Sequence, residues 1–224
     1  MNNTSAVKIL LIVFLLFIGC AQPQGTLPQY NQQLSIEEQK IQNQLFADSW
    51  LKTYIDVSEN GLNILFNAVD LCRDDDQIYG IGVDIATRYD GPESIRAELT
   101  KSLFLSDEIT VVATGINTPA RAAGFKKGDK IIKINNVSAP YGIDANSEFY
   151  KIIREAENKI HKFVINRDGQ DLTIEVGSKK RCRFGFFVDL DNSTFNAFAD
   201  GNYIALSLRM AKWLPQDEIG IALV

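Results

Sequence analysis

The order of apolar and polar positions predicts an apolar leader followed by helices and then by short strands. The leader is the apolar run over residues 9–18, which follows Lys8 and ends at Gly19 and Cys20. This run is too short to cross a bilayer as a helix and is typical of a signal peptide, here over residues 1–19. Residues 20–34 are rich in Gln, Pro and Gly, a composition that predicts a tether without a core of its own.

Residues 35–76 predict a helical region. Ser35-Ile36-Glu37-Glu38 has the form of a capping box that opens a helix. Two apolar stripes at helical spacing follow, one with Ile41, Leu45 and Phe46, the other with Leu62, Leu65, Phe66 and Val69. Gly61 and the segment 56–58 between the stripes predict a break into two helices.

Residues 77–178 alternate between strand and helix patterns, and the whole chain is therefore expected to be α+β. The segment Tyr79–Val83 starts a strand, and Ile109, Val111 and Ala113 alternate as another. Further predicted elements are a short helix after Pro92 with Ile95, Leu99 and Leu103 on one side, helical turns at 118–123 capped by Gly124, a turn and strand over 125–135, a helix over 145–159 and a hairpin over 162–176 that turns at Asp168-Gly169.

Charge and histidine content exclude several classes of function. The net charge of −5 and the pI near 5.0 argue against nucleic acid as a partner, because phosphate binding needs clustered Lys and Arg. The runs Lys126-Lys127 and 179–183 are basic but short, and we interpret them as solvated turns. The chain has one histidine, His161, whereas a hydrolytic zinc site usually takes three protein ligands. We expect no catalytic residue and no metal site, and we expect His161 at the surface or at a strand edge.

The three cysteines have different expected roles. Phe17-Ile18-Gly19-Cys20 resembles the bacterial lipobox, in which the cysteine is acylated and becomes the first mature residue; the alternative is a plain secretory signal with a chance cysteine. In a source with two membranes, Ala21 favours outer-membrane sorting. This resemblance implies a lipid anchor at Cys20 in the cell envelope, on the periplasmic or extracellular face. Cys72 and Cys182 would then be the two cysteines left in an oxidising compartment, and we expect a disulfide between them. The alternative is a buried free thiol at Cys72.

The middle block resembles a PDZ domain of the HtrA type. The segment GINTPARAAGFKKGDKIIKINN at residues 115–136 matches that family's core signature, and YGIGV at residues 79–83 looks like its carboxylate-binding loop. The resemblance implies a small β-barrel or sandwich with two helices over 77–178, which binds an extended or C-terminal peptide between a strand edge and the helix 145–159. The implied peptide-binding residues are Tyr79, Gly80, Ile81, Gly82, Val83, Phe149, Ile152 and Ile153. The alternative is a groove filled by residues 84–105.

The last segment, 182–224, resembles the run-up to the zinc helix of HtpX-like metallopeptidases (the peptidase M forty-eight family). It carries an NAF…DG hairpin around Asn196 and Gly201, then Asp217-Glu218, but no His-Glu-x-x-His follows. The resemblance implies a partial α+β hairpin and helix of a truncated zinc peptidase. Zinc is the cofactor of the intact family, and we expect no cofactor in this chain.

Three functions remain open at this stage. In the first, the chain is a membrane-anchored PDZ lipoprotein that binds extended or C-terminal segments of envelope proteins and does not cleave them. In the second, it is the substrate-recognition front part of an active zinc metalloprotease. In the third, it is a structural lipoprotein without a ligand. The resemblance of the last segment favours protease ancestry, and the missing zinc ligands favour binding as the present activity, so we expect the first.

Overall fold

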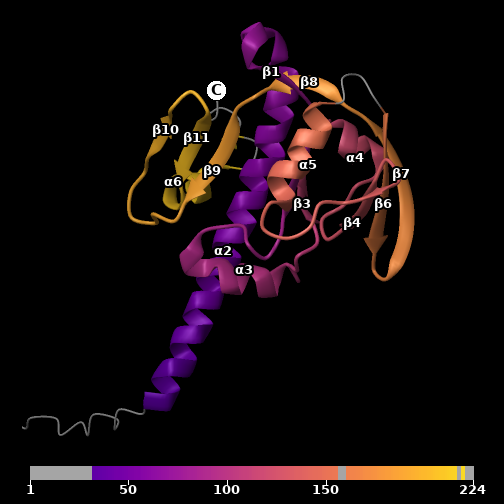
Figure 1. The fold of residues 1–224 in the computed structure, drawn as a ribbon. Helices are drawn as coiled ribbons and strands as arrows, with labels where there is room; N and C mark the ends of the chain where they lie inside the picture. Colours follow the sequence, from indigo (N-terminus) through magenta and orange to yellow (C-terminus); the bar gives the residue numbers. More distant parts are fainter. Residues whose placement is uncertain (1–31, 156–159, 216–217, 220–224) are drawn as a thin grey trace, which may run out of the picture. The chain divides into compact units, whose positions relative to one another are not determined.

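The computed structural model describes residues 32–155, 160–215 and 218–219. The predicted signal peptide, Cys20, most of the tether and residues 220–224 lie outside the described residues. Within residues 1–39 the structure describes the start of helix α2, and residues 40–224 hold the remaining elements (Figure 1).

The helices are α2 (Gln32–Asn67), η1 (Val69–Leu71), η2 (Asp74–Asp76), η3 (Glu93–Ile95), α3 (Arg96–Ser102), α4 (Pro119–Ala123), α5 (Ala145–Arg154) and α6 (Leu208–Trp213). The strands are β1 (Gln77–Gly80), β2 (Val83–Ala86), β3 (Thr110–Thr114), β4 (Lys130–Ile134), β5 (Val137–Ser138), β6 (Ile160–Arg167), β7 (Gln170–Gly177), β8 (Lys179–Cys182), β9 (Gly185–Asp189), β10 (Ala197–Ala199) and β11 (Tyr203–Ser207).

Helix α2 runs without interruption through Gly61, so the predicted break into two helices is wrong. Tertiary contacts explain the difference. Val57, Leu62 and Leu65 are buried on one side of the helix, and this burial outweighs the cost of about 1 kcal/mol that glycine adds to a helix interior. Gly61 is required by close packing, because a Cβ built there would lie 2.2 Å from Cδ2 of Phe186.

The middle of the chain forms an antiparallel sheet in the order β2-β3-β4-β6-β7, with β5 beside β4. One face of the sheet packs on α4 and α5 around Phe149 and Phe163, and the ring of Phe125 meets that of Phe163 edge-on at 5.1 Å. The predicted α+β class is confirmed, and so are the strands and the helical turns at 118–123. Helix α5 ends at Arg154, before the predicted end, and residues 156–159 are not described.

Two predicted turns have the expected geometry. Gly124 ends α4 in the left-handed conformation at φ 95°, and the Asp129 carboxylate closes the next turn by accepting the Lys126 N–H at 2.8 Å. Asp168 and Gly169 both have positive φ and join β6 to β7 as the sequence predicted.

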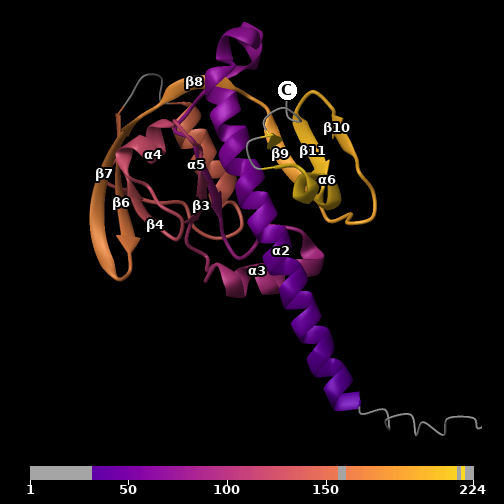
Figure 2. The same cartoon turned by 180° about the vertical axis from the view of Figure 1, so that it is seen from behind.

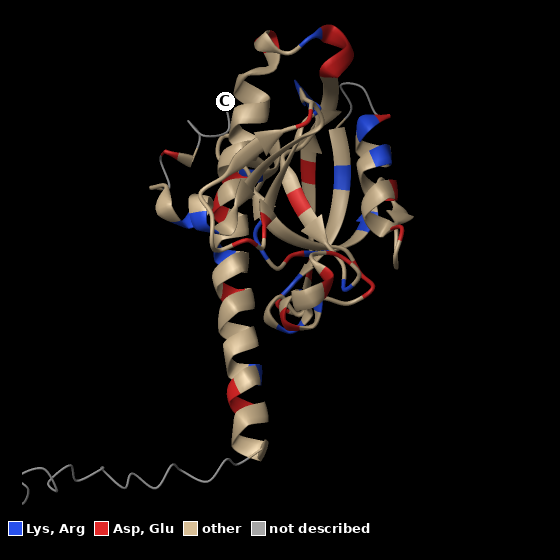
Figure 3. Cartoon of the chain, turned by 90° about the vertical axis from the view of Figure 1, so that its left-hand side faces the viewer, with Lys and Arg blue, Asp and Glu red and all other residues tan. Residues whose placement is uncertain are grey.

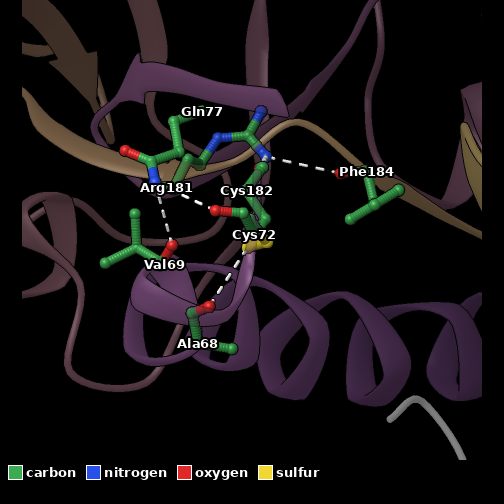
Figure 4. Close-up of a disulfide and its surroundings, with 7 residues drawn as sticks. All are labelled: Ala68, Val69, Cys72, Gln77, Arg181, Cys182 and Phe184. Carbon is green, nitrogen blue, oxygen red and sulfur yellow. Dashed lines mark hydrogen bonds between the residues drawn. A yellow bond between two sulfur atoms is a disulfide. The ribbon is translucent and has the colours of Figure 1, made fainter. Parts of the chain in front are cut away.

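Strand β1 pairs antiparallel with β8, and a disulfide closes this pair against the segment that follows α2. Cys72 and Cys182 are bonded across a separation of 110 residues, with Cα atoms 5.9 Å apart (Figure 4). The predicted bridge is confirmed. Gln77 adds to the closure, since its Nε2 donates to the carbonyl oxygens of Val69 and Cys72 at 3.2 and 3.1 Å.

The last strands form a small sheet in the order β10-β11-β9, in which β11 runs parallel to β9 and antiparallel to β10. Its core includes Leu206, Leu208 and Trp50 of α2, whose indole Nε1 donates to the Val188 carbonyl at 3.0 Å. Ser207 caps α6 by accepting the Met210 N–H at 3.2 Å. The predicted hairpin is thus present, whereas most of the helix expected to begin at Asp217-Glu218 lies outside the described residues. Helix α2 runs beside this small sheet (Figure 2).

The prediction that His161 lies at the surface or at a strand edge is wrong. Its side chain is 0 % exposed, because β6 lies between β4 and β7 and position 161 points to the same core as Phe163 and Ile165. The His161 ring lies 6.1 Å from that of Phe163, and its Nδ1 is 3.3 Å from Nδ2 of Asn135. His161 is a core residue of the sheet.

We expect the double variant Cys72→Ala, Cys182→Ala to lower the free energy of unfolding by about 2–5 kcal/mol, since the bridge closes a long loop in the unfolded chain. Urea unfolding in oxidising buffer measures the change. Reductant should destabilise the wild type by a similar amount and leave the double variant unchanged. A variant as stable as the wild type would contradict the structural role of the bridge.

We expect Gly61→Ala to destabilise the protein by about 1–3 kcal/mol despite the better helix propensity of alanine, because the new methyl overlaps the Phe186 ring. The matched control is the same change in a Phe186→Ala background, where the space is open and alanine should be neutral or stabilising. Thermal and urea unfolding of the four proteins give the coupling between the two sites. Stabilisation by Gly61→Ala alone would disprove this packing.

Candidate functional site

The segment Tyr79–Val83 forms a bend between two strands. Tyr79 and Gly80 end β1, Ile81 and Gly82 make the bend, and Val83 begins β2. Gly82 has φ 84°, and a Cβ there would lie 2.3 Å from Cβ of Thr118, so the position requires glycine. The carbonyl of Ile81 accepts the Ala120 N–H at 2.8 Å, and that of Gly82 accepts the Thr118 hydroxyl at 3.2 Å. The start of α4 therefore fixes the bend.

Helix α5 lies opposite the bend and β2. Phe149 and Ile153 are buried in the sheet core, and Ile152 is partly buried against it. Two side chains of α5 reach β2: the Tyr150 hydroxyl donates to the Val83 carbonyl and Asn146 Nδ2 to the Ile85 carbonyl, both at 3.4 Å. At 3.4 Å both bonds are long for their type, so we expect them to be weak.

The predicted peptide-binding residues meet around a small cavity, with the exception of Ile152. The cavity has a volume of about 20 Å³, which is room for about one water molecule. Its predicted lining residues are Tyr79, Gly80, Ile81, Gly82, Val83, Phe149 and Ile153, and Leu62, Tyr150, Arg154 and Arg181 complete the wall. In this conformation the cavity is too small for a large terminal side chain.

Residues 84–105 do not fill this space beyond the start of β2. Ile95 and Leu99 pack instead with Trp50 and Val112 in the second core. Two further neighbours of the bend come from segments before and after the middle sheet: Leu62 from α2 and Arg181 from β8. These two residues lie outside the predicted groove, and no periodicity in the sequence links them to it.

A larger cleft of about 630 Å³ begins at the same place. Tyr54, Ser58, Leu62 and Leu65 of α2 form one wall, and Val83 and Asp84 of β2 with Tyr150 and Arg154 of α5 form another. The remaining wall comes from the segment after the sheet, with Arg181, Arg183, Phe184, Gly185 and Phe186, and from Asn202 and Tyr203. The volume is typical of a ligand site.

Polar groups on the cleft wall have shifted pKa values. Burial raises the pKa of Asp84, while hydrogen bonds from the hydroxyls of Tyr54 and Ser58, at 2.7 and 2.8 Å, lower it in part. Burial and the nearby Asp84 carboxylate raise the pKa values of Tyr54 and Tyr150, so both phenols stay protonated. The cleft wall thus contains hydroxyl groups and one carboxylate, Asp84, which already accepts hydrogen bonds from Tyr54 and Ser58.

Arg181 is the site residue that the sequence analysis missed. The interpretation of the run 179–183 as a solvated turn is wrong in part, because residues 179–182 form β8 and the Arg181 side chain is partly buried against the bend, whereas Lys179, Lys180 and Arg183 are exposed. A Cβ on Gly80 would lie 2.8 Å from Nε of Arg181. The guanidinium Nη1 donates to the carbonyls of Cys182 at 3.0 Å and Phe184 at 3.4 Å (Figure 4). The signal that could have found it is the predicted disulfide, which places residue 182 beside the start of the middle block.

Other classes of site find less support in the described part of the chain. It contains no group of three or more His, Cys, Asp or Glu residues placed to hold a metal ion. None of the helices within the described ranges is long and apolar enough to span a membrane. In the view of Figure 3, segments with Lys and Arg (blue) and segments with Asp and Glu (red) are both spread over several elements of the described ribbon.

Comparisons with known proteins bear on the middle of the chain. No curated protein matches the sequence. Among solved structures, the HtrA3 PDZ domain bound to a phage-derived ligand has 20% identity and a TM-score of 0.36, over 46% of this chain and 88% of that one. The HtrA-type protease AlgW with a decapeptide has 23% identity and a TM-score of 0.37, over 47% of this chain and 30% of that one. The photosystem II D1 C-terminal processing protease has 18% identity and a TM-score of 0.35, over 50% and 26%. The chain thus spans less than a third of either protease.

Comparison with protein-family models identifies a domain in this part of the chain. Residues 80–177 match the model of the PDZ domain family. This range begins at Gly80 in the bend and ends with β7, so it contains β2, the sheet and both helices that cover it. Arg181 and the residues of α2 that line the cleft lie outside it. Residues 80–177 of this chain are therefore a PDZ domain.

Proposed function

We propose that this protein binds peptides at its PDZ domain, by addition of an extended segment to β2 inside the 630 Å³ cleft. The observation that carries the proposal is the position of β2. Among the described residues β2 is the edge strand of its sheet, and the cleft opens along it. An edge strand offers unpaired backbone groups, which is the usual requirement for binding a peptide as an added strand.

The backbone of β2 supports this mode of binding. The carbonyls of Val83 and Ile85 point toward α5 and accept long bonds from Tyr150 and Asn146, as they would accept the N–H groups of an added strand. These side chains would have to move aside when a peptide binds. Because the bonds that hold them are long, the cost of breaking them is small.

The end of the peptide would lie at the bend. Backbone N–H groups of a glycine-containing bend are suited to a carboxylate, so we propose that residues 79–83 hold the C-terminus. The terminal side chain would point to the cavity lined by Ile81, Phe149 and Ile153, with Ile152 beside it. Since that cavity has a volume of about 20 Å³, a side chain as small as that of alanine fits it best in this conformation.

We further propose that the protein acts in the cell envelope, anchored through acylated Cys20 and taking segments of envelope proteins as partners. The residues that support this are the apolar run 9–18 and the lipobox-like Phe17–Cys20.

A second candidate function is recruitment of substrates to a zinc peptidase. The observation in its favour is that the peptidase-like segment 195–207 folds as the hairpin β10–β11 followed by α6. In either case this chain binds and does not cleave.

Strand addition predicts an alternating response to backbone methylation of the ligand. A peptide with a free, apolar C-terminus, chosen from a library, should bind the full-length protein at about micromolar Kd. Methylation of each amide in turn should weaken binding at least tenfold at every second position, because successive N–H groups of a strand point to opposite sides. Fluorescence polarisation measures the series. Uniform effects along the peptide, or a library without any binder, would overturn the proposal.

We expect labelled palmitate to enter the wild-type protein in a bacterial host and not the variant Cys20→Ser, since the thiol is the acyl acceptor of a lipobox. Cys72→Ser is the matched control and should keep the label. Autoradiography of membrane fractions reads out the result. Equal labelling of the wild type and Cys20→Ser would disprove the anchor.

A further inference from the structure

The cleft contains an arginine that has no carboxylate partner among the described residues. Arg181 makes no ion pair with a described residue, and its hydrogen bonds there use Nη1 alone, to two backbone carbonyls. The Nε–H and the Nη2 hydrogens have no acceptor on the described chain. Nε and Nη2 form the side-on pair with which arginine binds a carboxylate in two parallel hydrogen bonds.

The charges around Arg181 favour an anion. Arg154 and Arg183 line the same cleft, against one carboxylate, Asp84. Asp84 is engaged by Tyr54 and Ser58, so it does not neutralise the arginine by contact. Burial lowers the pKa of Arg181, which means that removing its charge from water is costly and that an incoming anion would relieve this cost.

The position of Arg181 is fixed before any ligand binds. Its strand pairs with β1 from Gln77 to Gly80, and its neighbour Cys182 is tied to Cys72. The side chain lies against Gly80, the first residue of the bend, where any larger residue would displace it. A charged group held in place in this way loses little conformational entropy on binding.

We propose that Arg181 is a specificity-determining residue of the PDZ domain, a receptor for a carboxylate of the bound peptide that is supplied by a strand outside the domain. The carboxylate is either the peptide's C-terminus or an acidic side chain close to it. This inference rests on the proposed peptide binding and adds to it the chemistry of the ligand's anionic group. It also assigns a function to the segment after the PDZ domain, because β8 delivers the arginine.

A thermodynamic cycle tests the proposal with the peptide chosen by the methylation series. Three forms of that peptide are titrated: a free acid without acidic side chains, its C-terminal amide, and an amide with glutamate near the end. Arg181→Gln should weaken binding of the free acid at least tenfold and leave the plain amide unchanged, which identifies the C-terminus as the anion. Loss confined to the glutamate peptide identifies an acidic side chain instead. Arg181→Lys should restore part of the loss.

The control is Lys180→Gln, which removes one positive charge from the residue of β8 that precedes Arg181. Lys180 is exposed and does not line the cleft, so it should change none of the three affinities. Urea unfolding of each variant shows whether the fold is kept. If Arg181→Gln weakens acid and amide peptides equally, or has no effect while the methylation series still alternates, the role of Arg181 is refuted and peptide binding stands.

A second measurement decides the matter if no peptide in the library binds. N-acetylvaline and N-acetylvalinamide are titrated into ¹⁵N-labelled protein, and the arginine Nε–Hε resonances are followed by NMR. The resonance that is lost in Arg181→Lys should shift with the acid and not with the amide. No shift, or the same shift with both compounds, would overturn the carboxylate subsite independently of strand addition.

Discussion

The arrangement of the site depends on the pairing of β1 with β8, closed by the Cys72–Cys182 disulfide. This pairing brings residues 179–182 against the bend that starts at Gly80, although a whole PDZ domain separates the two strands in sequence. The same closure holds the end of α2, through Val69 and Cys72, next to β1. Without this pairing, nothing would hold Leu62 and Arg181 beside Val83 in the wall of the cleft.

This closure changes what the edge of β2 can bind. In an isolated sheet an edge strand is open to any extended chain and is a liability for aggregation. Here α2 covers one side of the edge with Tyr54, Ser58 and Leu62, and the segment Phe184–Phe186 covers another. The edge is thus accessible from a walled cleft of limited volume, which favours the end of a chain over a long internal segment.

Arg167 and Arg181 differ in the hydrogen-bond partners of their guanidinium groups. Arg167 binds the fully buried Asp129 through Nε and Nη2, at 2.6 and 2.8 Å, and Asp129 also accepts the Lys126 N–H. Both carboxylate oxygens of Asp129 accept these bonds, so the pair stabilises the turn. Arg181 is also removed from water in part, but it has only backbone carbonyls as partners on the described chain. Because of this difference in partners, Arg181 keeps donors for a ligand in the cleft and Arg167 does not.

The sequence by itself determined the local elements of the PDZ domain and the residues at its bend. Glycines at 82, 124 and 169 mark positions with positive φ, and alternation at 109–113 marks a strand, because both signals arise from the backbone and its nearest neighbours. The disulfide also followed from the sequence, because the expected acylation of Cys20 left two cysteines to pair. The predicted peptide-binding residues, apart from Ile152, also meet around one cavity, but this pairing of residues 79–83 with helix α5 came from the resemblance to the PDZ family and not from any local pattern.

The tertiary structure alone decided the rest. The break predicted near Gly61 is absent because the Phe186 ring packs against that glycine, a contact between residues 125 positions apart that no local pattern contains. His161 is buried because its side chain points to the same sheet core as Phe163, and Arg181 is partly buried because β8 pairs with β1, while Lys179 and Lys180 of the same strand stay exposed. Burial of a polar residue depends on which distant segment covers it, and that is a property of the topology rather than of the neighbouring sequence.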